Sequence, residues 1–197
     1  MSATVDTTRT RRSGRLAGVL ALVVAAVLAG CAKDATDFGV LAAGETMPDG
    51  ITVTSTAFLA GEAVPERYSC EGENIPPPLA WKGVPPGTAE LAVVIEDPDA
   101  PDGTFVHWLV VGIDPAATGL SGTTLPPGAE VLPGSSDNPT YIGPCPPNDD
   151  GDHRYVFEVY ALRRRPALDT AATPVDKVRA VRNAAVAGGF LLGTFAR

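Results

Sequence analysis

The chain has 197 residues, enough for one domain with a sizeable core, and its 21 glycines and 19 prolines favour a loop-rich, β-dominated protein. Residues 1–30 hold four of the 15 basic and one of the 23 acidic residues, which leaves the remainder with a net charge of −11. Such an acidic body excludes non-specific nucleic-acid binding, which needs clustered lysine and arginine, and argues against electrostatic adhesion to anionic lipid. It does not exclude a local anion site.

Residues 1–30 have the pattern of an export signal. Four arginines precede an uninterrupted stretch of small and apolar residues at 16–29. This stretch is as long as the hydrophobic region of a signal peptide and too short for a comfortable transmembrane helix. It ends in Leu28-Ala29-Gly30-Cys31, which resembles a bacterial lipobox. The resemblance implies cleavage after Gly30 and an acyl anchor on Cys31, with palmitate-type chains, at the extracytoplasmic face of the cell membrane. The alternative is a plain signal peptide, or a short anchor, with an incidental cysteine.

The rest of the chain divides into a tether and a domain. Residues 31–50 have no clear period and are interpreted as a flexible tether, and residues 51–197 are expected to form one folded domain. Residues 90–96 are apolar almost throughout, which predicts a strand buried on both faces. Residues 114–139 are rich in Gly, Pro, Ser and Thr and are expected to be irregular. The predicted strands are 51–55, 79–81, 90–96, 105–113, 153–162 and 190–195.

One helix is predicted, over residues 174–188. Its apolar positions can line one face, and its basic positions are expected to face solvent. Gly188-Gly189 is expected to end it. The apolar positions are Val175, Val178, Ala180, Val181, Ala185 and Val186, and the basic positions are Lys177, Arg179 and Arg182.

Two cysteines remain once Cys31 is assigned to the lipid anchor. An even pair in an exported protein suggests a disulfide between Cys70 and Cys145. The alternative is two thiols that never meet, because spacing in the sequence says nothing about distance in space.

Polar chemistry concentrates at a stiff acidic turn that contains Asp97 and Asp99 and two prolines. The chain has only two histidines, and His107 and His153 each lie at or near the start of a predicted strand. If the two strands start at the same end of one sheet, both histidines converge on the acidic turn. Tyr155 then shares a strand face with His153. The alternatives are structural histidines, and aspartates that only bond turn amides.

These segments resemble the signatures of the phosphatidylethanolamine-binding protein family, in its bacterial Raf-kinase-inhibitor-like branch. The matching segments are Asp97-Pro98-Asp99-Ala100-Pro101, His107-Trp108-Leu109-Val110-Val111, Gly143-x-Cys145-Pro146-Pro147 and His153-Arg154-Tyr155. The resemblance covers roughly residues 51–197 and implies a β-sandwich with Greek-key topology and one or two short helices. One departure is the acidic insert Asn148-Asp149-Asp150, whose carboxylates could weaken anion binding.

The resemblance also implies a small cavity for phosphate-like anions or phospholipid headgroups. Its lining residues would be Asp97, Asp99, His107, Gly143, Pro147, His153 and Tyr155. We expect the two carboxylates to orient both histidines and to raise their pKa values, and backbone amides near Gly143 to help hold the anion. Anion affinity should then rise as the pH falls toward about 6. A carboxylate could instead receive an ammonium headgroup.

The function expected from the resemblance is that of a non-enzymatic binding protein without a cofactor, anchored to the membrane through Cys31. The family also includes modulators of kinases and inhibitors of serine proteases, so a protein target is possible. A metal-dependent hydrolase is an alternative, since two histidines and two aspartates could hold Zn²⁺. Against it, the sequence has no nucleophile-elbow or zinc-protease motif. A structural surface lipoprotein is the third alternative.

Overall fold

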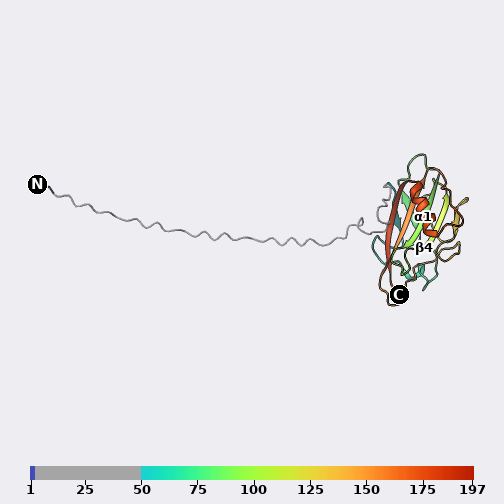
Figure 1. Cartoon of the computed structure of the whole chain (residues 1–197), viewed down its shortest axis with the longest axis horizontal. Coiled ribbons are helices and arrows are strands. Elements are labelled where there is room, and N and C mark those ends of the chain that lie inside the picture. The colour runs from blue at the N-terminus through green and yellow to red at the C-terminus, as the bar shows by residue number, and fades with distance from the viewer. Residues whose placement is uncertain (3–49) are drawn as a thin grey trace. The chain divides into compact units, whose positions relative to one another are not determined.

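The computed structural model describes residues 1–2 and 50–197 (Figure 1). Residues 3–30 of the predicted signal peptide and residues 31–49 of the predicted tether, with the lipidation site Cys31, lie outside the described residues. Residues 50–197 form two antiparallel sheets, one α-helix and one short 3₁₀ helix, so the expected mainly β sandwich is confirmed. The strands are β1 (Thr52–Ser55), β2 (Leu79–Lys82), β3 (Glu90–Asp97), β4 (Phe105–Ile113), β5 (Gly119–Leu120), β6 (Glu130–Leu132), β7 (His153–Leu162) and β8 (Ala185–Phe195). The helices are η1 (Glu66–Tyr68) and α1 (Pro174–Ala184).

Strand β3 lies at the centre of the larger sheet, whose strand order is β6-β4-β3-β7-β8. Successive β3 side chains point to opposite faces and enter different cores. Val93 and Ile95 belong to the core that the two sheets share, and Ala92 and Val94 belong to the core beneath α1. Because both faces of β3 are covered, its sequence is apolar almost throughout, as expected.

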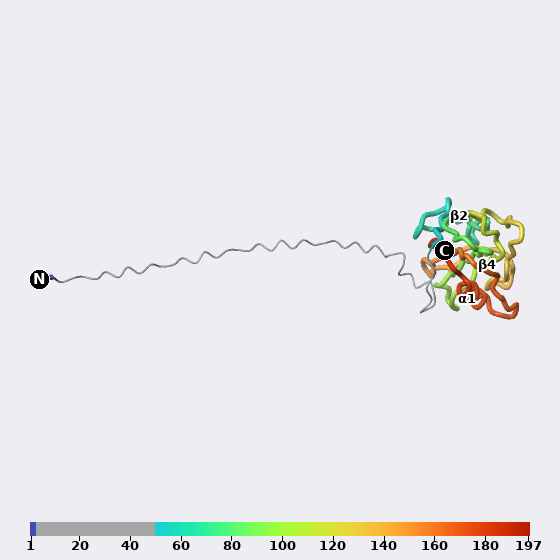
Figure 2. The backbone as a smooth tube through the Cα atoms, turned by 90° about the horizontal axis from the view of Figure 1, so that it is seen from above, coloured from blue at the N-terminus to red at the C-terminus, as the bar shows by residue number. Residues whose placement is uncertain are grey.

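The smaller sheet has the order β1-β2-β5 and covers one face of the larger sheet. Trp81 of β2 and Trp108 of β4 are both buried in the shared core, and the Trp81 indole N–H donates to the carbonyl oxygen of Ala117 at 2.7 Å. Residues 114–139 are less irregular than expected, because they contain β5 and β6, which pair with β2 and β4. Figure 2 shows β4 between β2 and α1.

Helix α1 covers the other face of the larger sheet. It begins at Pro174 after the N-cap Thr173, whose hydroxyl oxygen accepts from the Asp176 amide at 3.2 Å. Val178 and Val181 are fully buried against the sheet, as expected. The expectation that Lys177 faces solvent is wrong, because this residue is buried.

Arg182 was also expected to face solvent, but it reaches beneath the helix to two carboxylates on the sheet. Its guanidinium contacts Glu96, and it donates to both Glu158 carboxylate oxygens at 3.0 Å and to the Tyr160 hydroxyl at 2.9 Å. Glu158 is fully buried. Burial and the neighbouring charge of Glu96 raise the pKa of Glu158 to about 8, although Arg182 opposes the shift.

The end of α1 also differs from the expectation. The helix ends at Ala184, and strand β8 begins at the next residue, so Gly188-Gly189 lies inside a strand. A Cβ at Gly189 would lie 1.9 Å from the carbonyl oxygen of Ile51, and the Ile51 amide donates to Gly188 at 3.1 Å. The glycines therefore allow close approach of another backbone instead of ending a helix. Val186, expected to face the core, is 38% exposed.

The topology brings the predicted site residues to one end of the larger sheet. Strand β3 runs antiparallel to both β4 and β7, and Glu96 near its end pairs with Val106 on one side and Val156 on the other. The end of β3, with Asp97, therefore lies between the starts of β4 and β7. His107 and His153 flank it.

Candidate ligand-binding site

Asp97 and His153 form a buried pair. Both side chains are 4% exposed, and the Asp97 carboxylate lies 2.7 Å from His153 Nδ1. A second carboxylate, that of Asp150, lies 3.3 Å from His153 Nε2. Burial alone would lower the pKa of His153, but Asp97 and Asp150 outweigh it and raise that pKa. Because carboxylates only accept, the two contacts together favour the imidazolium form, in which both ring nitrogens donate.

Asp150 belongs to the acidic insert Asn148-Asp149-Asp150. Its side chain is 48% exposed, and it occupies the outer nitrogen of His153. While it stays there, His153 has no N–H left for a ligand. The insert thus supplies an anion of its own at the place where the family resemblance implies a bound one.

His107 has the opposite electrostatic behaviour. Its Nδ1 lies 2.8 Å from the carbonyl oxygen of Ile142, which can only accept, so Nδ1 carries the proton. Burial lowers the pKa of His107, and the Ile142 hydrogen bond and the charge of Asp97 offset only part of that effect. The expectation that the carboxylates raise the pKa of both histidines is therefore wrong for His107. Neutral His107 is left with a buried Nε2 lone pair that has no partner among the described residues.

Tyr155 supplies a second buried polar atom without a partner. The residue is fully buried, and its hydroxyl has no hydrogen-bond partner among residues 1–2 and 50–197. Its ring meets the His107 ring edge-on, with centroids 5.3 Å apart. Burial, with the charge of Asp97, raises the pKa of Tyr155, so the hydroxyl keeps its proton at neutral pH.

Asp99 does not contact either histidine ring. Its carboxylate accepts from the Arg154 side chain at 2.6 and 2.8 Å and from the Arg154 amide at 2.9 Å. These bonds lower the pKa of Asp99, although partial burial opposes them. The role of Arg154 was not deduced from the sequence, although it lies between two predicted site residues. Arg154 fixes the Asp99 side chain against the start of β7. The Asp97 carboxylate accepts from the Asp99 amide at 2.8 Å, and this bond shapes the turn.

Gly143 positions the loop that holds His107. A Cβ at Gly143 would lie 2.1 Å from the Tyr68 carbonyl oxygen, so only glycine fits. The Gly143 amide donates to the Asn74 side chain at 2.7 Å and is not available to an anion in this structure, contrary to expectation. Pro147 is exposed at the far end of the same loop, where its carbonyl accepts from the Asp150 amide at 3.3 Å.

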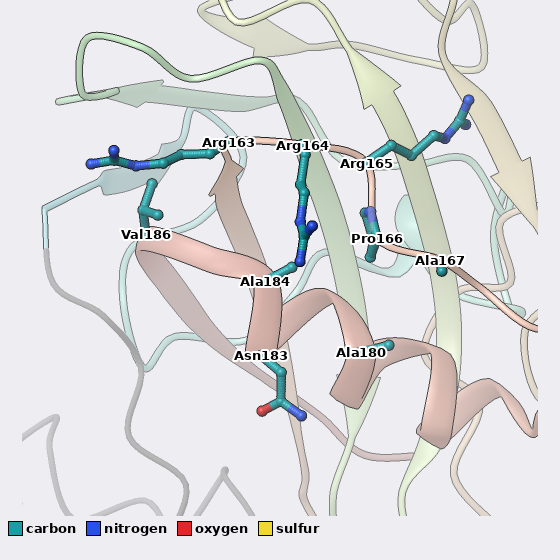
Figure 3. Close-up of a pocket in the computed structure, with 9 residues that line it drawn as sticks. All are labelled: Arg163, Arg164, Arg165, Pro166, Ala167, Ala180, Asn183, Ala184 and Val186. Atoms are coloured by element: carbon teal, nitrogen blue, oxygen red, sulfur yellow. The ribbon is translucent and has the colours of Figure 1, made fainter.

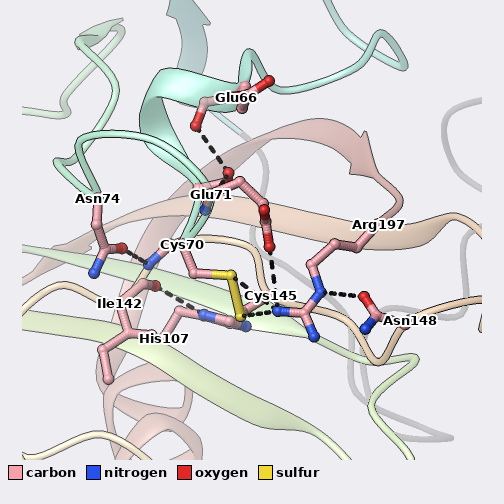
Figure 4. The surroundings of a disulfide bond; sticks show 11 residues. Glu66, Cys70, Glu71, Asn74, His107, Ile142, Cys145, Asn148 and Arg197 are labelled. Atoms are coloured by element: carbon pink, nitrogen blue, oxygen red, sulfur yellow. Dashed lines mark hydrogen bonds and ion pairs between the residues drawn. A yellow bond between two sulfur atoms is a disulfide. The ribbon is translucent and has the colours of Figure 1, made fainter.

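A disulfide joins this loop to the loop after η1. Cys70 and Cys145 are bonded in the structure, with Cα atoms 5.5 Å apart. The Arg197 guanidinium lies over the disulfide, 3.2 Å from the Cys145 sulfur, and donates to Asn148 at 2.9 Å and pairs with Glu71 at 3.4 Å (Figure 4). The last residue of the chain thus connects the disulfide to the acidic insert.

The family model described as "Phosphatidylethanolamine-binding protein" matches residues 54–196, nearly the whole described domain. This chain belongs to the phosphatidylethanolamine-binding protein family. Within the family, it is 41% identical over 145 residues to "Putative lipoprotein LppC" of Mycobacterium tuberculosis, covering 74% of this chain and 72% of that relative. It is also 41% identical to "UPF0098 protein Mb1945c" of Mycobacterium bovis over 159 residues, covering 78% of this chain and 77% of the relative.

A solved structure of the same family has a similar fold. The crystal structure of Escherichia coli YbcL, described as a new member of the mammalian PEBP family, superposes with a TM-score of 0.70. It is 30% identical in sequence, and the match covers 75% of this chain and 99% of YbcL. The fold expected from the resemblance is therefore confirmed.

Two further observations concern the residues that the structure describes. In residues 1–2 and 50–197, no group of three or more His, Cys, Asp or Glu side chains is arranged to hold a metal ion. Within the same residues, no helix combines the length and the apolar character that crossing a membrane requires.

Proposed function

We propose that this family member is a non-enzymatic binding protein whose ligand is a small phosphate-bearing molecule. The observation that carries the proposal is the pair of buried, unpartnered polar atoms, His107 Nε2 and the Tyr155 hydroxyl. Buried polar atoms in folded proteins nearly always have a partner, and an exception calls for an explanation. A ligand that pairs with both atoms would provide it, and membership of the family supports that explanation.

The protonation states define what the ligand must offer. Neutral His107 accepts at Nε2, so the ligand must donate a proton there, and the Tyr155 hydroxyl can donate to a ligand oxygen. A phosphate monoester in its singly protonated form has both a P–OH donor and acceptor oxygens. An ammonium headgroup on a phosphodiester is a second source of the donor. Sulfate has acceptors only and should bind poorly.

The other predicted site residues act on this pair in different ways. Asp97 keeps His153 charged, and Asp99 holds Arg154. Gly143 and Pro147 belong to the loop whose Ile142 carbonyl holds His107. Because the two unpartnered atoms are buried, a ligand reaches them only after the surrounding residues move outward. Binding should therefore be slower than diffusional encounter.

The proposal is tested by calorimetric titration with methyl phosphate and with sulfate at pH 8 and pH 6. The second pKa of a phosphate monoester is about 6, so the singly protonated form becomes abundant over this range. We expect the affinity for methyl phosphate to rise about tenfold or more, while sulfate, which controls for titration of His153, gains much less. Equal gains for both anions would contradict the role of His107 as an acceptor. O-phosphoethanolamine serves as the probe for an ammonium donor.

Asp150 should compete with the ligand for His153. We expect Asp150→Asn to raise the affinity for methyl phosphate about fivefold, because a weaker acceptor vacates the outer nitrogen more readily. The matched control is Asp149→Asn, which removes the same charge from the neighbouring exposed position. A gain of equal size in both variants would show a general charge effect and not competition at His153.

We also propose that the mature protein is exported and held on the membrane by acyl chains on Cys31. The lipobox-like sequence before Cys31 supports this, as does the name of the relative LppC. Intact-mass measurement of protein extracted from membranes should show a chain that starts at Cys31 with added acyl mass. Cys31→Ala should abolish both the cleavage after Gly30 and the added mass. An unmodified Cys31 in the wild-type protein would refute the anchor.

A further inference from the structure

An open groove lies between α1 and the segment that follows β7, on the side of α1 that does not face the sheet core (Figure 3). Its volume is about 700 Å³. Ala180, Ala184 and Val186 give it an apolar wall, and Arg163, Arg164 and Arg165 lie along its other side. Among the residues that the structure describes, no acidic residue lines it. The groove is therefore a cationic and apolar site on an acidic domain, and it is separate from the His107–His153 site.

Two of the three arginines have no acidic partner within the described part of the chain. Arg165 pairs with Glu130 at 3.0 Å and lies 3.9 Å from Glu90. Arg163 and Arg164 are exposed, and among the described residues neither has an acidic partner within 4.0 Å. Two uncompensated guanidinium groups beside an apolar wall are complementary to an anionic partner with an apolar portion, and guanidinium binds phosphate well.

The groove also lies beside the point where the tether joins the domain. Gly50 is the first residue of the described domain, and a Cβ built on it would lie 3.4 Å from Cβ of Ala187. The next residue, Ile51, donates its amide to Gly188 at 3.1 Å. Val186, which lines the groove and is 38% exposed, is adjacent to Ala187. A chain anchored at Cys31 would therefore enter the domain at the edge of this groove.

We propose that this groove is the membrane-facing surface of the domain, where Arg163 and Arg164 contact the phosphates of anionic phospholipids. The inference rests on the proposed lipid anchor at Cys31. Nineteen positions separate Cys31 from Gly50. The sequence predicts a flexible tether at residues 31–50, and a flexible linker of that length has a root-mean-square span of about 25 Å, so the anchor alone would leave the domain free to rotate. The arginines select one orientation.

The acidic charge of the whole domain does not prevent this contact. At physiological ionic strength, exposed charges separated by more than about 8 Å are largely screened, so the local arginines dominate at a surface that touches the groove. One basic residue near an anionic membrane shifts the equilibrium between the free and the membrane-contacting orientation about fivefold, and two shift it about 30-fold. The domain would thus orient on the membrane without the arginines acting as its anchor.

The test uses the full mature protein, purified from membranes, on two kinds of vesicle. One kind is phosphatidylcholine alone, and the other contains about three parts of phosphatidylglycerol to seven of phosphatidylcholine. Arginine side chains are modified with phenylglyoxal, and the rate at each position is read by peptide mass spectrometry. We expect Arg163 and Arg164 to react at least fivefold more slowly on the anionic vesicles, and 0.5 M NaCl to remove the protection. Arg67, an exposed arginine on η1, is the internal control and should react equally on both.

Three outcomes would overturn the inference. Equal reactivity of Arg163 and Arg164 on both vesicles, in a protein whose mass shows the acyl chains, refutes the membrane contact alone. A mass without acyl chains refutes the anchor and the inference together, and so is distinguishable from the first outcome. Protection by soluble polyglutamate but not by anionic vesicles would assign the groove to an acidic protein partner.

Discussion

Replacing Tyr155 by phenylalanine should make the protein more stable and a weaker binder. The Tyr155 hydroxyl is fully buried and unpartnered among the described residues, so the folded protein carries the cost of removing it from water. An unsatisfied buried hydroxyl costs about 1–3 kcal/mol. Deleting it should raise the free energy of unfolding by about 1 kcal/mol. The affinity for methyl phosphate at pH 6 should fall about tenfold, because a hydrogen bond to a charged oxygen is lost.

Tyr141 provides a matched control within the same region. Its hydroxyl is also buried, but it donates to the Tyr68 carbonyl oxygen at 2.7 Å. Tyr141→Phe should therefore lower the free energy of unfolding by about 1–2 kcal/mol and leave ligand affinity unchanged. Urea unfolding and calorimetric titration measure the two quantities. The reasoning is refuted if the two variants lose stability alike, or if Tyr155→Phe binds methyl phosphate as tightly as the wild type.

Three further predictions concern the rest of the fold. Arg182→Ala should lower the free energy of unfolding by about 3–5 kcal/mol, because it takes the cation from the buried Glu96 and the hydrogen-bond donor from the buried Glu158, whereas Arg179→Ala, on the exposed face of α1, should cost less than about 1 kcal/mol in the same urea experiment. Folded Glu158 keeps a proton that the unfolded chain releases, so the free energy of unfolding should fall as the pH rises from about 4.5 to about 8. In the wild type this fall should be roughly 3–5 kcal/mol between pH 5 and 8.5, and Glu158→Gln should abolish it. Parallel pH profiles of stability for the two proteins would contradict this. Replacing Cys70 and Cys145 by alanine should cost about 2–4 kcal/mol in thermal or urea unfolding, since the bond closes a loop of 75 residues, and an unchanged midpoint would show that the bond does not stabilise the domain.

The sequence contained the features that determine the larger sheet and the position of the site. The run at 90–96 is apolar almost throughout because two different cores cover β3, and that pattern was sufficient to predict a strand buried on both faces. The acidic turn and the two histidines lie together, as expected, because β3 is antiparallel to both of its neighbours. The end of the helix could not be read from Gly188-Gly189, because those glycines serve a contact with Ile51 that is distant in sequence.

The electrostatics of the site depended on pairings that the sequence does not reveal. Asp97 and Asp99 are two residues apart, yet one pairs with His153 and the other with Arg154. His107 is neutral because burial lowers its pKa, and a backbone carbonyl 35 positions away fixes the remaining proton on Nδ1. Likewise, helical periodicity placed Arg182 on the outer face of α1, and only the buried carboxylates across the sheet explain why it turns inward.

The most direct test of the central claim is the nitrogen-15 spectrum of the imidazole rings, which only two histidines populate. In the free protein at neutral pH, we expect His107 to be protonated on Nδ1 alone and Nε2 to resonate as a bare acceptor. Saturating methyl phosphate at pH 6 should move the Nε2 resonance upfield, as a hydrogen bond forms to its lone pair, and sulfate should not. A doubly protonated His107 in the free protein, or an Nε2 resonance that methyl phosphate leaves unchanged, would contradict the account.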